Sequence, residues 1–158
     1  MGGTTLRMAD LKAIAEELGL ERPRTFIASG NLLFTSDKSE RAVKYALEAA
    51  LKEHMARDVK VMVRTAAEIA KVVTENPFAD EPGNRVVAIF LDDAPPKDAL
   101  DDARNVADER MALGRREFYV HYAGGQGRSK LRIPTAARGT ARNMNSVTKL
   151  AELAEEVA

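Results

Sequence analysis

The chain has 158 residues, of which 45% are hydrophobic and 30% are charged, and its formal net charge is zero. This composition is that of a globular protein, and the length suits one ordinary domain or two small ones. Cysteine is absent, which excludes disulfides, thiolate metal sites and a cysteine nucleophile, and which fits a cytoplasmic location. No apolar run approaches the roughly 20 residues that cross a bilayer, so we expect no membrane segment.

The first half of the chain alternates between helix and strand patterns. In chain order these predict a helix at residues 8–18, strands at 25–28 and 32–35, a helix opened by Asp37, a strand at 59–63 and a short helix opened by Thr65. Asp37 with Glu40 has the spacing of a capping box. A polar segment at residues 80–84 separates this half from the next, so we predict domains at residues 1–80 and 81–158.

The second half begins with six apolar residues at 86–91, a pattern typical of a strand buried on both faces. It continues with a helix after Pro95-Pro96, strands at 111–113 and 118–122, a glycine-rich loop at 124–127, a short helix within 128–137, a strand at 140–144 and a helix at 146–157. This order is that of the ferredoxin-like, or split βαβ, unit. The first half fits the same unit if its first strand is missing. We therefore predict an α+β fold of two tandem ferredoxin-like units, the first lacking its first strand.

Four segments carry a resemblance to a known family: RTFIASGNLLF, VRTAAEIAKVVTENPF, GRSKL and ARNMNSVTKL. In this order and spacing they resemble the bacterial family called domain of unknown function 1697, over nearly the whole chain. The resemblance implies two tandem ferredoxin-like units and no particular activity. Family members usually begin with an apolar strand that runs into an R-G-x-N-x-G-G segment, of which only Gly2-Gly3 remains here. They also usually carry an aromatic residue where this chain has Met144.

The missing strand has a physical consequence for the first unit. The first strand of a ferredoxin-like sheet lies in its interior, so its loss leaves two neighbouring strands with unpaired backbone groups, which are costly when buried. Three outcomes stay open: the two neighbours close on each other, another chain supplies a strand, or the start of the chain is misassigned. The second outcome predicts a homodimer formed through the incomplete first sheet.

Charge is unevenly placed along the chain. Residues 80–109 include nine acidic and three basic residues, whereas residues 115–149 include eight basic residues and one acidic residue. A basic stretch of this density attracts phosphate or another anion locally. The alternative is that the acidic stretch folds back and neutralises the basic one.

Two elements of the basic stretch are candidates for an anion site. The loop GGQGRSKL offers backbone N–H groups that glycine leaves open to a ligand, beside basic side chains. The segment RNMN precedes a helix, and helix N-termini favour anions. The candidate ligand-binding residues are Arg128, Ser129, Lys130, Arg142, Asn143, Asn145 and Lys149. The alternative is that Asn145 or Ser146 only caps the helix and that Arg142 is a solvated charge.

The turn Ser29-Gly30-Asn31 is a second candidate site, which Arg24 reaches if its side chain lies on the same face. The alternative is a hairpin turn that requires Gly and Asn, with Arg24 solvated. Alternation places Tyr119 and His121 on one face of a strand, where an acid–base pair and a structural position are both open interpretations. Neither histidine of the chain has the spacing of metal ligands, so we predict no metal site and no cofactor.

These patterns favour a protein that binds a phosphate-bearing ligand, either a nucleotide or nucleic acid, through basic loops of the second half. One alternative is an enzyme whose cleft, between the two units, holds Ser29, Asn31, Tyr119 and His121. The other is a protein-interaction module, such as the homodimer through the first sheet. The aromatic RNA-binding motif of plaits of this shape is absent, so the RNA hypothesis depends on charge alone.

Overall fold

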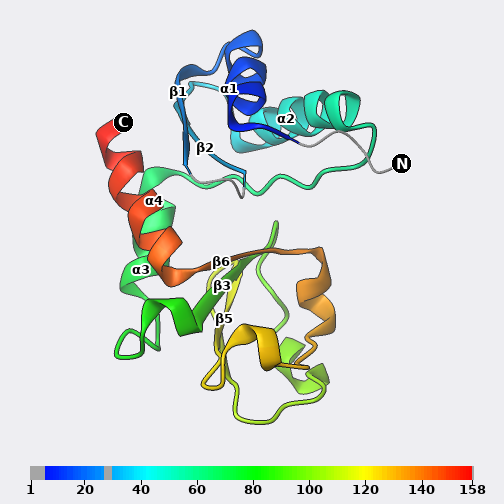
Figure 1. Cartoon of the computed structure of the whole chain (residues 1–158), viewed down its shortest axis with the longest axis vertical. Coiled ribbons are helices and arrows are strands. Elements are labelled where there is room, and N and C mark those ends of the chain that lie inside the picture. The colour runs from blue at the N-terminus through cyan, green and yellow to red at the C-terminus, as the bar shows by residue number, and fades with distance from the viewer. Residues whose placement is uncertain (1–5, 27–29, 158) are drawn as a thin grey trace. The chain divides into compact units, whose positions relative to one another are not determined.

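The computed structural model describes residues 6–26 and 30–157 (Figure 1). Its α-helices are α1 (Met8–Glu17), α2 (Glu40–Met55), α3 (Ala66–Thr74) and α4 (Met144–Val157). Its strands are β1 (Glu21–Phe26), β2 (Asn31–Thr35), β3 (Val86–Phe90), β4 (Arg110–Leu113), β5 (Glu117–His121) and β6 (Thr140–Asn143). The helices and the two antiparallel sheets make an α+β fold, which confirms the predicted class.

The chain forms two compact units. The first unit holds the described residues up to Ala66 together with residues 150–157, and the second unit holds residues 67–149. The sequence places a boundary between residues 80 and 81, whereas residues 67–80 group with the second unit here. The last turns of α4 return to the first unit, which no composition shift in the sequence indicates.

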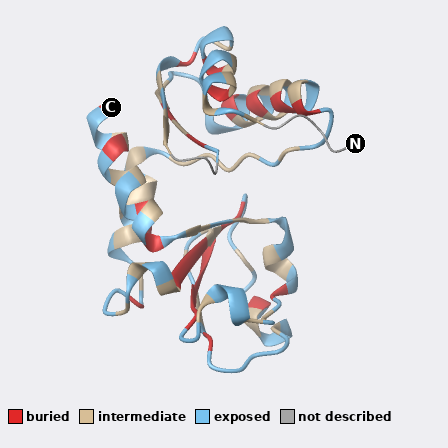
Figure 2. Ribbon diagram, viewed as in Figure 1, coloured by how far each residue is buried: buried red, intermediate tan, exposed pale blue. Residues whose placement is uncertain are grey.

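The first unit contains a hairpin of the antiparallel strands β1 and β2. Leu32 and Phe34 pack beside α1 and α2, in a cluster built on Ala15, Leu20, Val43 and Leu47. Leu33, which points to the other face of β2, packs with Leu153 and Val157 of α4. Strand β2 is therefore covered on both faces, although it is hydrogen-bonded to a strand on one edge only within the described residues (Figure 2).

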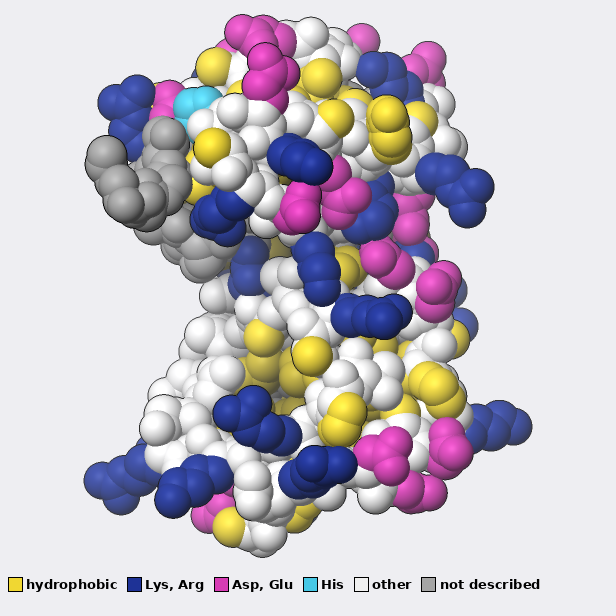
Figure 3. Space-filling model, turned by 90° about the vertical axis from the view of Figure 1, so that its right-hand side faces the viewer, with side chains coloured by type: hydrophobic (Ala, Val, Ile, Leu, Met, Phe, Trp, Pro, Cys, Tyr) yellow, Lys and Arg dark blue, Asp and Glu magenta, His cyan; other side chains and the backbone are white. Residues whose placement is uncertain are grey.

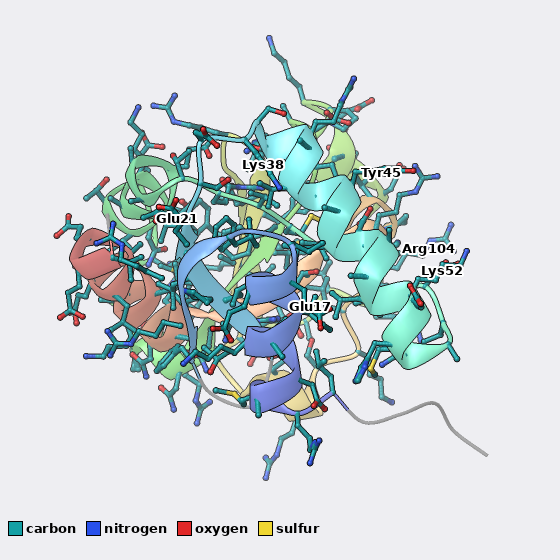
Figure 4. The ribbon with its side chains drawn as sticks, turned by 90° about the horizontal axis from the view of Figure 1, so that it is seen from above. Glu17, Glu21, Lys38, Tyr45, Lys52 and Arg104 are labelled. Carbon is teal, nitrogen blue, oxygen red and sulfur yellow. The ribbon has the colours of Figure 1, made fainter. Side chains whose placement is uncertain are left out.

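Helix α2 covers this hairpin with its apolar side and leaves its other side exposed. Its first turn is capped by Ser39, whose Oγ accepts a 3.1 Å hydrogen bond from the backbone N–H of Ala42, and not by Asp37 as predicted. Figure 4 shows Tyr45 and Lys52 projecting from the side of α2 that faces away from α1. Tyr45 is 76% exposed, so it contributes little to the core.

The predicted strand at residues 59–63 is not paired with any strand that the structure describes, and that prediction is wrong. Its apolar side chains do enter the core, since Val61 and Val63 pack against the α1–α2 cluster. The backbone N–H of Val61 donates to the Glu48 carboxylate at 3.0 Å, and its carbonyl accepts from the Lys44 ammonium at 2.5 Å. Side chains of α2 thus satisfy backbone groups that a sheet would otherwise pair.

The second unit contains a four-stranded antiparallel sheet in the order β4-β5-β3-β6. Strands β3 and β4 follow each other in the chain but are separated in space by β5, which is the strand arrangement of a split βαβ unit. Single turns of 3-10 helix replace the crossover α-helices of that unit: η2 (Ala99–Asp102), η3 (Gln126–Arg128) and η4 (Pro134–Arg138). The ferredoxin-like prediction is therefore not confirmed as a whole.

The helix predicted after Pro95-Pro96 fails for a local reason. The segment carries Asp98, Asp101 and Asp102, and aspartate competes with the helix by hydrogen bonding to nearby backbone groups. Only the short η2 forms, and its first residue, Ala99, is buried. The chain then leaves η2 in an extended conformation, which brings Arg104 beside a distant segment.

The two faces of this sheet bury different side chains. Phe118 and Val120 of β5 join Val87 and Ile133 in an apolar cluster, and the 3-10 turns cover this side. Tyr119 and His121 occupy the opposite face, because side chains alternate along a strand. Strands β3 and β5 are the most completely buried part of the unit (Figure 2).

Candidate functional site

The segment that follows η3 presents basic side chains on an anchored backbone. Ser129 and Ile133 have extended dihedral angles, with φ/ψ of −77°/139° and −117°/106°. Leu131 and Ile133 pack into the apolar cluster of the sheet. Lys130 and Arg132 alternate with them and are exposed. Burial of one side of this segment therefore fixes the direction in which its cations point.

Arg132 lies directly opposite Arg104. The two residues form an antiparallel bridge in which each backbone N–H donates to the other's carbonyl, at 2.8 and 3.0 Å. Both residues are exposed, and among the described residues neither guanidinium has a hydrogen bond or ion pair. Like charges directly opposite each other on two strands are destabilising. We call this pair the arginine bridge.

Other cations of the second unit are neutralised within it, by carboxylates of α3 and the residues after it. Arg115 forms a bidentate pair with Glu75, at 2.9 and 2.8 Å, and Arg116 pairs with Glu68 at 3.1 Å. Arg110 reaches Glu81 at 2.8 Å. By contrast, Arg128, Lys130, Arg132 and Arg138 form no side-chain hydrogen bond or ion pair with any residue that the structure describes. The carboxylates that pair with Arg115 and Arg116 thus precede the acidic stretch in the chain, and the four unpaired cations have no acidic partner among the described residues.

Ser129 connects the basic segment to a buried carboxylate. Its Oγ donates to Oε2 of Glu109 at 2.5 Å and accepts from the backbone N–H of Leu131 at 3.1 Å. The other oxygen of Glu109 accepts from the backbone N–H of Ala107 at 2.7 Å. The bond from Ser129 and the bond from Ala107 together lower the pKa of Glu109 below its usual range. Ser129 thus positions its neighbours Arg128 and Lys130.

The candidates near α4 do not join this segment. Arg142 lies on β6 opposite Ala88, on the sheet face that holds Tyr119, whereas Lys130 and Arg132 belong to the layer over the other face. Arg142 is half-buried, and desolvation lowers the pKa of its guanidinium. Lys149 is exposed on α4. The two predicted elements of the anion site are therefore not brought together.

Asn143 and Asn145 have structural partners. The Asn143 Oδ1 accepts from the backbone N–H of Ser146 at 2.9 Å, which caps α4. Asn145 packs closely over Gly83, where a Cβ atom would clash with the Asn145 Oδ1. The sequence correctly indicated a side-chain cap at this helix start, but assigned it to Asn145 or Ser146 and not to Asn143.

The second candidate site, around the first hairpin, belongs to the first unit. Arg24 forms a 3.0 Å ion pair with Glu156 of α4. The Asn31 Nδ2 donates to the carbonyl of Phe26 at 3.1 Å, which closes the hairpin. Gly30 has a φ of +79°, a conformation that glycine adopts readily. Ser29 lies outside the described residues. The two described side chains thus serve the hairpin and its packing.

Tyr119 and His121 share a face as predicted, and each is engaged separately. The Tyr119 hydroxyl donates to the carbonyl of Val72 at 2.8 Å. The His121 ring lies 3.5 Å from Glu81 and 3.3 Å from the Arg110 guanidinium, and it stacks at a tilt on Phe78. The described residues contain no group of three side chains placed to hold a metal ion. None of the described helices is long and apolar enough to cross a membrane.

The sequence analysis did not identify Arg104 as a candidate residue of the anion site. Its charge falls in the acidic stretch, and its position opposite Arg132 depends on a bridge between segments that are distant in the chain. A hint existed in the alternation of Lys130 and Arg132 with Leu131 and Ile133, which predicts that both cations point to the same side.

Comparison with known proteins agrees with this fold. A solved structure, that of the conserved bacterial protein SP0830 from Streptococcus pneumoniae, is similar over 94% of this chain and 89% of that chain, with a TM-score of 0.73 and 20% identity. A comparison with curated proteins finds no match. The model of the family described as "Protein of unknown function (DUF1697)" matches residues 1–119, and the chain belongs to that family.

Proposed function

We propose that the second unit binds a phosphate-bearing ligand, a nucleotide or nucleic acid, through the arginine bridge and the cations beside it. The arginine bridge is the observation that carries this proposal. The backbones of Arg104 and Arg132 pair directly opposite each other, both residues are exposed, and neither forms an ion pair with a described carboxylate. An anion bound across the pair would convert a repulsion into two charge-assisted contacts, and arginine suits phosphate because its donors form a planar fork.

Lys130 and Arg128 extend the positive charge of the bridge along the same segment. Figure 3 shows several Lys and Arg side chains around a small hydrophobic area on one face of the second unit. The segment is held in place from beneath by Leu131 and Ile133, and from the side by the bond between Ser129 and Glu109. A ligand would therefore meet cations whose backbone is already ordered, which lowers the entropic cost of binding.

Binding of a fluorescent single-stranded oligonucleotide and of adenosine triphosphate tests the proposal. We expect at least one of the two to bind, with affinity that falls as salt rises. The double variant R104Q/R132Q should lose most of this binding. The control R41Q/R57Q removes the same charge from exposed arginines of the first unit and should retain it. Full binding by R104Q/R132Q would refute the site.

Formation of a homodimer through the first sheet is a second candidate function, and strand β2 is the feature that favours it. Its two faces are covered by α1, α2 and α4, as in an interior strand, but it pairs only with β1 among the described residues. Pairing between the open edges of two copies would supply the missing ladder of hydrogen bonds. Light scattering over a range of concentrations tests this, since a monomer mass at every concentration would rule the dimer out.

A further inference from the structure

The chemistry of the second unit narrows the ligand class. Building on the proposed function, we infer that the ligand is a nucleic acid strand. The protein holds several successive phosphates of the strand's backbone and does not recognise its bases. Three features of the structure lead to this conclusion: the layout of the unneutralised cations, the burial of every aromatic ring in the unit, and the acidic residues that border the site.

The unneutralised cations form a row and not a pocket. Arg128 ends η3, and Lys130 and Arg132 follow at alternate positions of an extended segment. Residues two apart in an extended chain are separated by about 6.6 Å, so Arg128 and Arg132 stand roughly 10 Å or more apart. A single phosphate group is too small to contact both ends of such a row. A chain of phosphates is able to do so, with the arginine bridge at one end.

The row begins at the end of η3, where the backbone N–H of Arg128 donates to the carbonyl of Gly125 at 3.3 Å. The chain reaches the start of β6 after η4, whose last residue is the exposed Arg138. The exposed cations are therefore spaced along one continuous segment between η3 and β6, and a linear polyanion is the ligand that suits charges spaced in this way.

The unit offers no aromatic surface on which a base could stack. Its five aromatic residues are Phe78, Phe90, Phe118, Tyr119 and Tyr122, and each is at most 9% exposed. Proteins of plait shape that read RNA stack bases on exposed strand aromatics, and here the rings of β5 serve the core. Base-specific recognition by stacking is therefore excluded for this unit. The same observation disfavours a mononucleotide, since only its phosphates would be bound.

Acidic side chains limit the number of phosphates that the row neutralises. Asp101 and Asp102 of η2 are exposed close to Arg104 in the chain, and they form no ion pair with the row. They lower the positive potential at that end of the row. We therefore expect contact with about three or four phosphates and the modest affinity of non-specific binding.

Fluorescence anisotropy with two single-stranded DNA probes of equal length, oligothymidylate and a mixed sequence, tests this inference. Three to four contacts give a slope of about −2 to −3 for the logarithm of the binding constant against the logarithm of the salt concentration. R104Q/R132Q should reduce the magnitude of that slope by about 1.4, which is two contacts at about 0.7 each. R41Q/R57Q should leave it unchanged. Circular dichroism of each variant verifies that it is folded.

Competition separates this inference from the proposed function. Adenosine triphosphate and inorganic triphosphate should displace the DNA only weakly, and the two DNA probes should bind within about twofold of each other, because the phosphate contacts carry no sequence information. If the triphosphates bind as tightly as DNA, the proposed function stands and the strand inference is overturned. A tenfold preference between the probes also overturns the strand inference. If neither DNA nor the triphosphates bind, both proposals fail.

Discussion

The hydroxyl of Tyr119 on β5 donates a 2.8 Å hydrogen bond to the carbonyl of Val72, and so connects the sheet of the second unit to α3. Val72 lies in the last turn of α3, where carbonyls have no partner within the helix. Both residues are buried, and burial raises the pKa of the Tyr119 phenol well above its usual value. The phenol is therefore neutral, and it completes the end of a helix.

Replacing Tyr119 by Phe should destabilise the second unit. The substitution keeps the ring but leaves the buried carbonyl of Val72 without its partner, which costs about 1–3 kcal/mol. Urea unfolding of the two proteins measures the difference. Tyr45→Phe is the matched control, because Tyr45 is 76% exposed, and we expect a change within about 0.5 kcal/mol there. Equal losses for the two variants would contradict a specific role for the Tyr119 hydroxyl.

Asn143 provides a test between helix capping and ligand binding. Asn143→Ala removes the acceptor for the N–H of Ser146 and should cost about 0.5–2 kcal/mol of stability, with nucleic acid binding unchanged. Asn143→Asp keeps an acceptor and adds a negative charge at the start of α4, which the helix dipole favours. Thermal melting should therefore show a loss for the alanine variant and none for the aspartate variant. A drop in DNA affinity with stability intact would assign Asn143 to the ligand instead.

Two glycines of the second unit should respond differently to alanine. A Cβ on Gly139 would lie 2.7 Å from Cγ2 of Ile89 and 2.8 Å from the carbonyl oxygen of Phe90. Backbone at that distance has to move, so Gly139→Ala should cost about 1–3 kcal/mol. A Cβ on Gly127 would have no atom within 4 Å. Gly127→Ala should leave the unfolding midpoint nearly unchanged. A similar loss of stability in both variants would show that the backbone freedom of glycine, and not the close approach at Gly139, determines the effect.

Glu109 should make the free energy of unfolding depend on pH in the acid range. Its pKa in the folded protein is below the ordinary value of about 4.5, because the Ser129 hydroxyl and the N–H of Ala107 donate to its carboxylate. Such a group stabilises the fold above the unfolded pKa, and its contribution is lost as the pH falls through the folded pKa. We expect Glu109→Gln to be less stable than the parent at neutral pH and equally stable at pH values below the folded pKa.

Chemical unfolding of Glu109→Gln across a pH series measures this effect. Asp93→Asn is the control, because Asp93 is exposed and forms no hydrogen bond or ion pair with the described residues. The control should follow the parent at every pH. If the difference between parent and Glu109→Gln stays constant from acid to neutral pH, the carboxylate does not supply the predicted stabilisation.

Local patterns in the sequence were sufficient to predict most of the helices and strands. The predicted helices at 8–18 and 146–157 correspond to α1 and α4, and the apolar run at 86–91 corresponds to β3. Periodicity depends on which side of one segment is buried, and that information lies within the segment itself. The short helix predicted within residues 128–137 is only partly present, since residues 129–133 are extended and the 3-10 helix η4 begins at Pro134.

Only the tertiary structure decided which segments meet. The sequence does not indicate that Arg104 faces Arg132, nor that Arg142 lies on the other face of the sheet, because both depend on pairings between segments far apart in the chain. The residues at 59–63 have a strand pattern, but a strand also requires a neighbour, and side chains of α2 satisfy the backbone of Val61 instead. Residue types thus determined burial and charge, whereas contacts between distant segments determined which cations stand together.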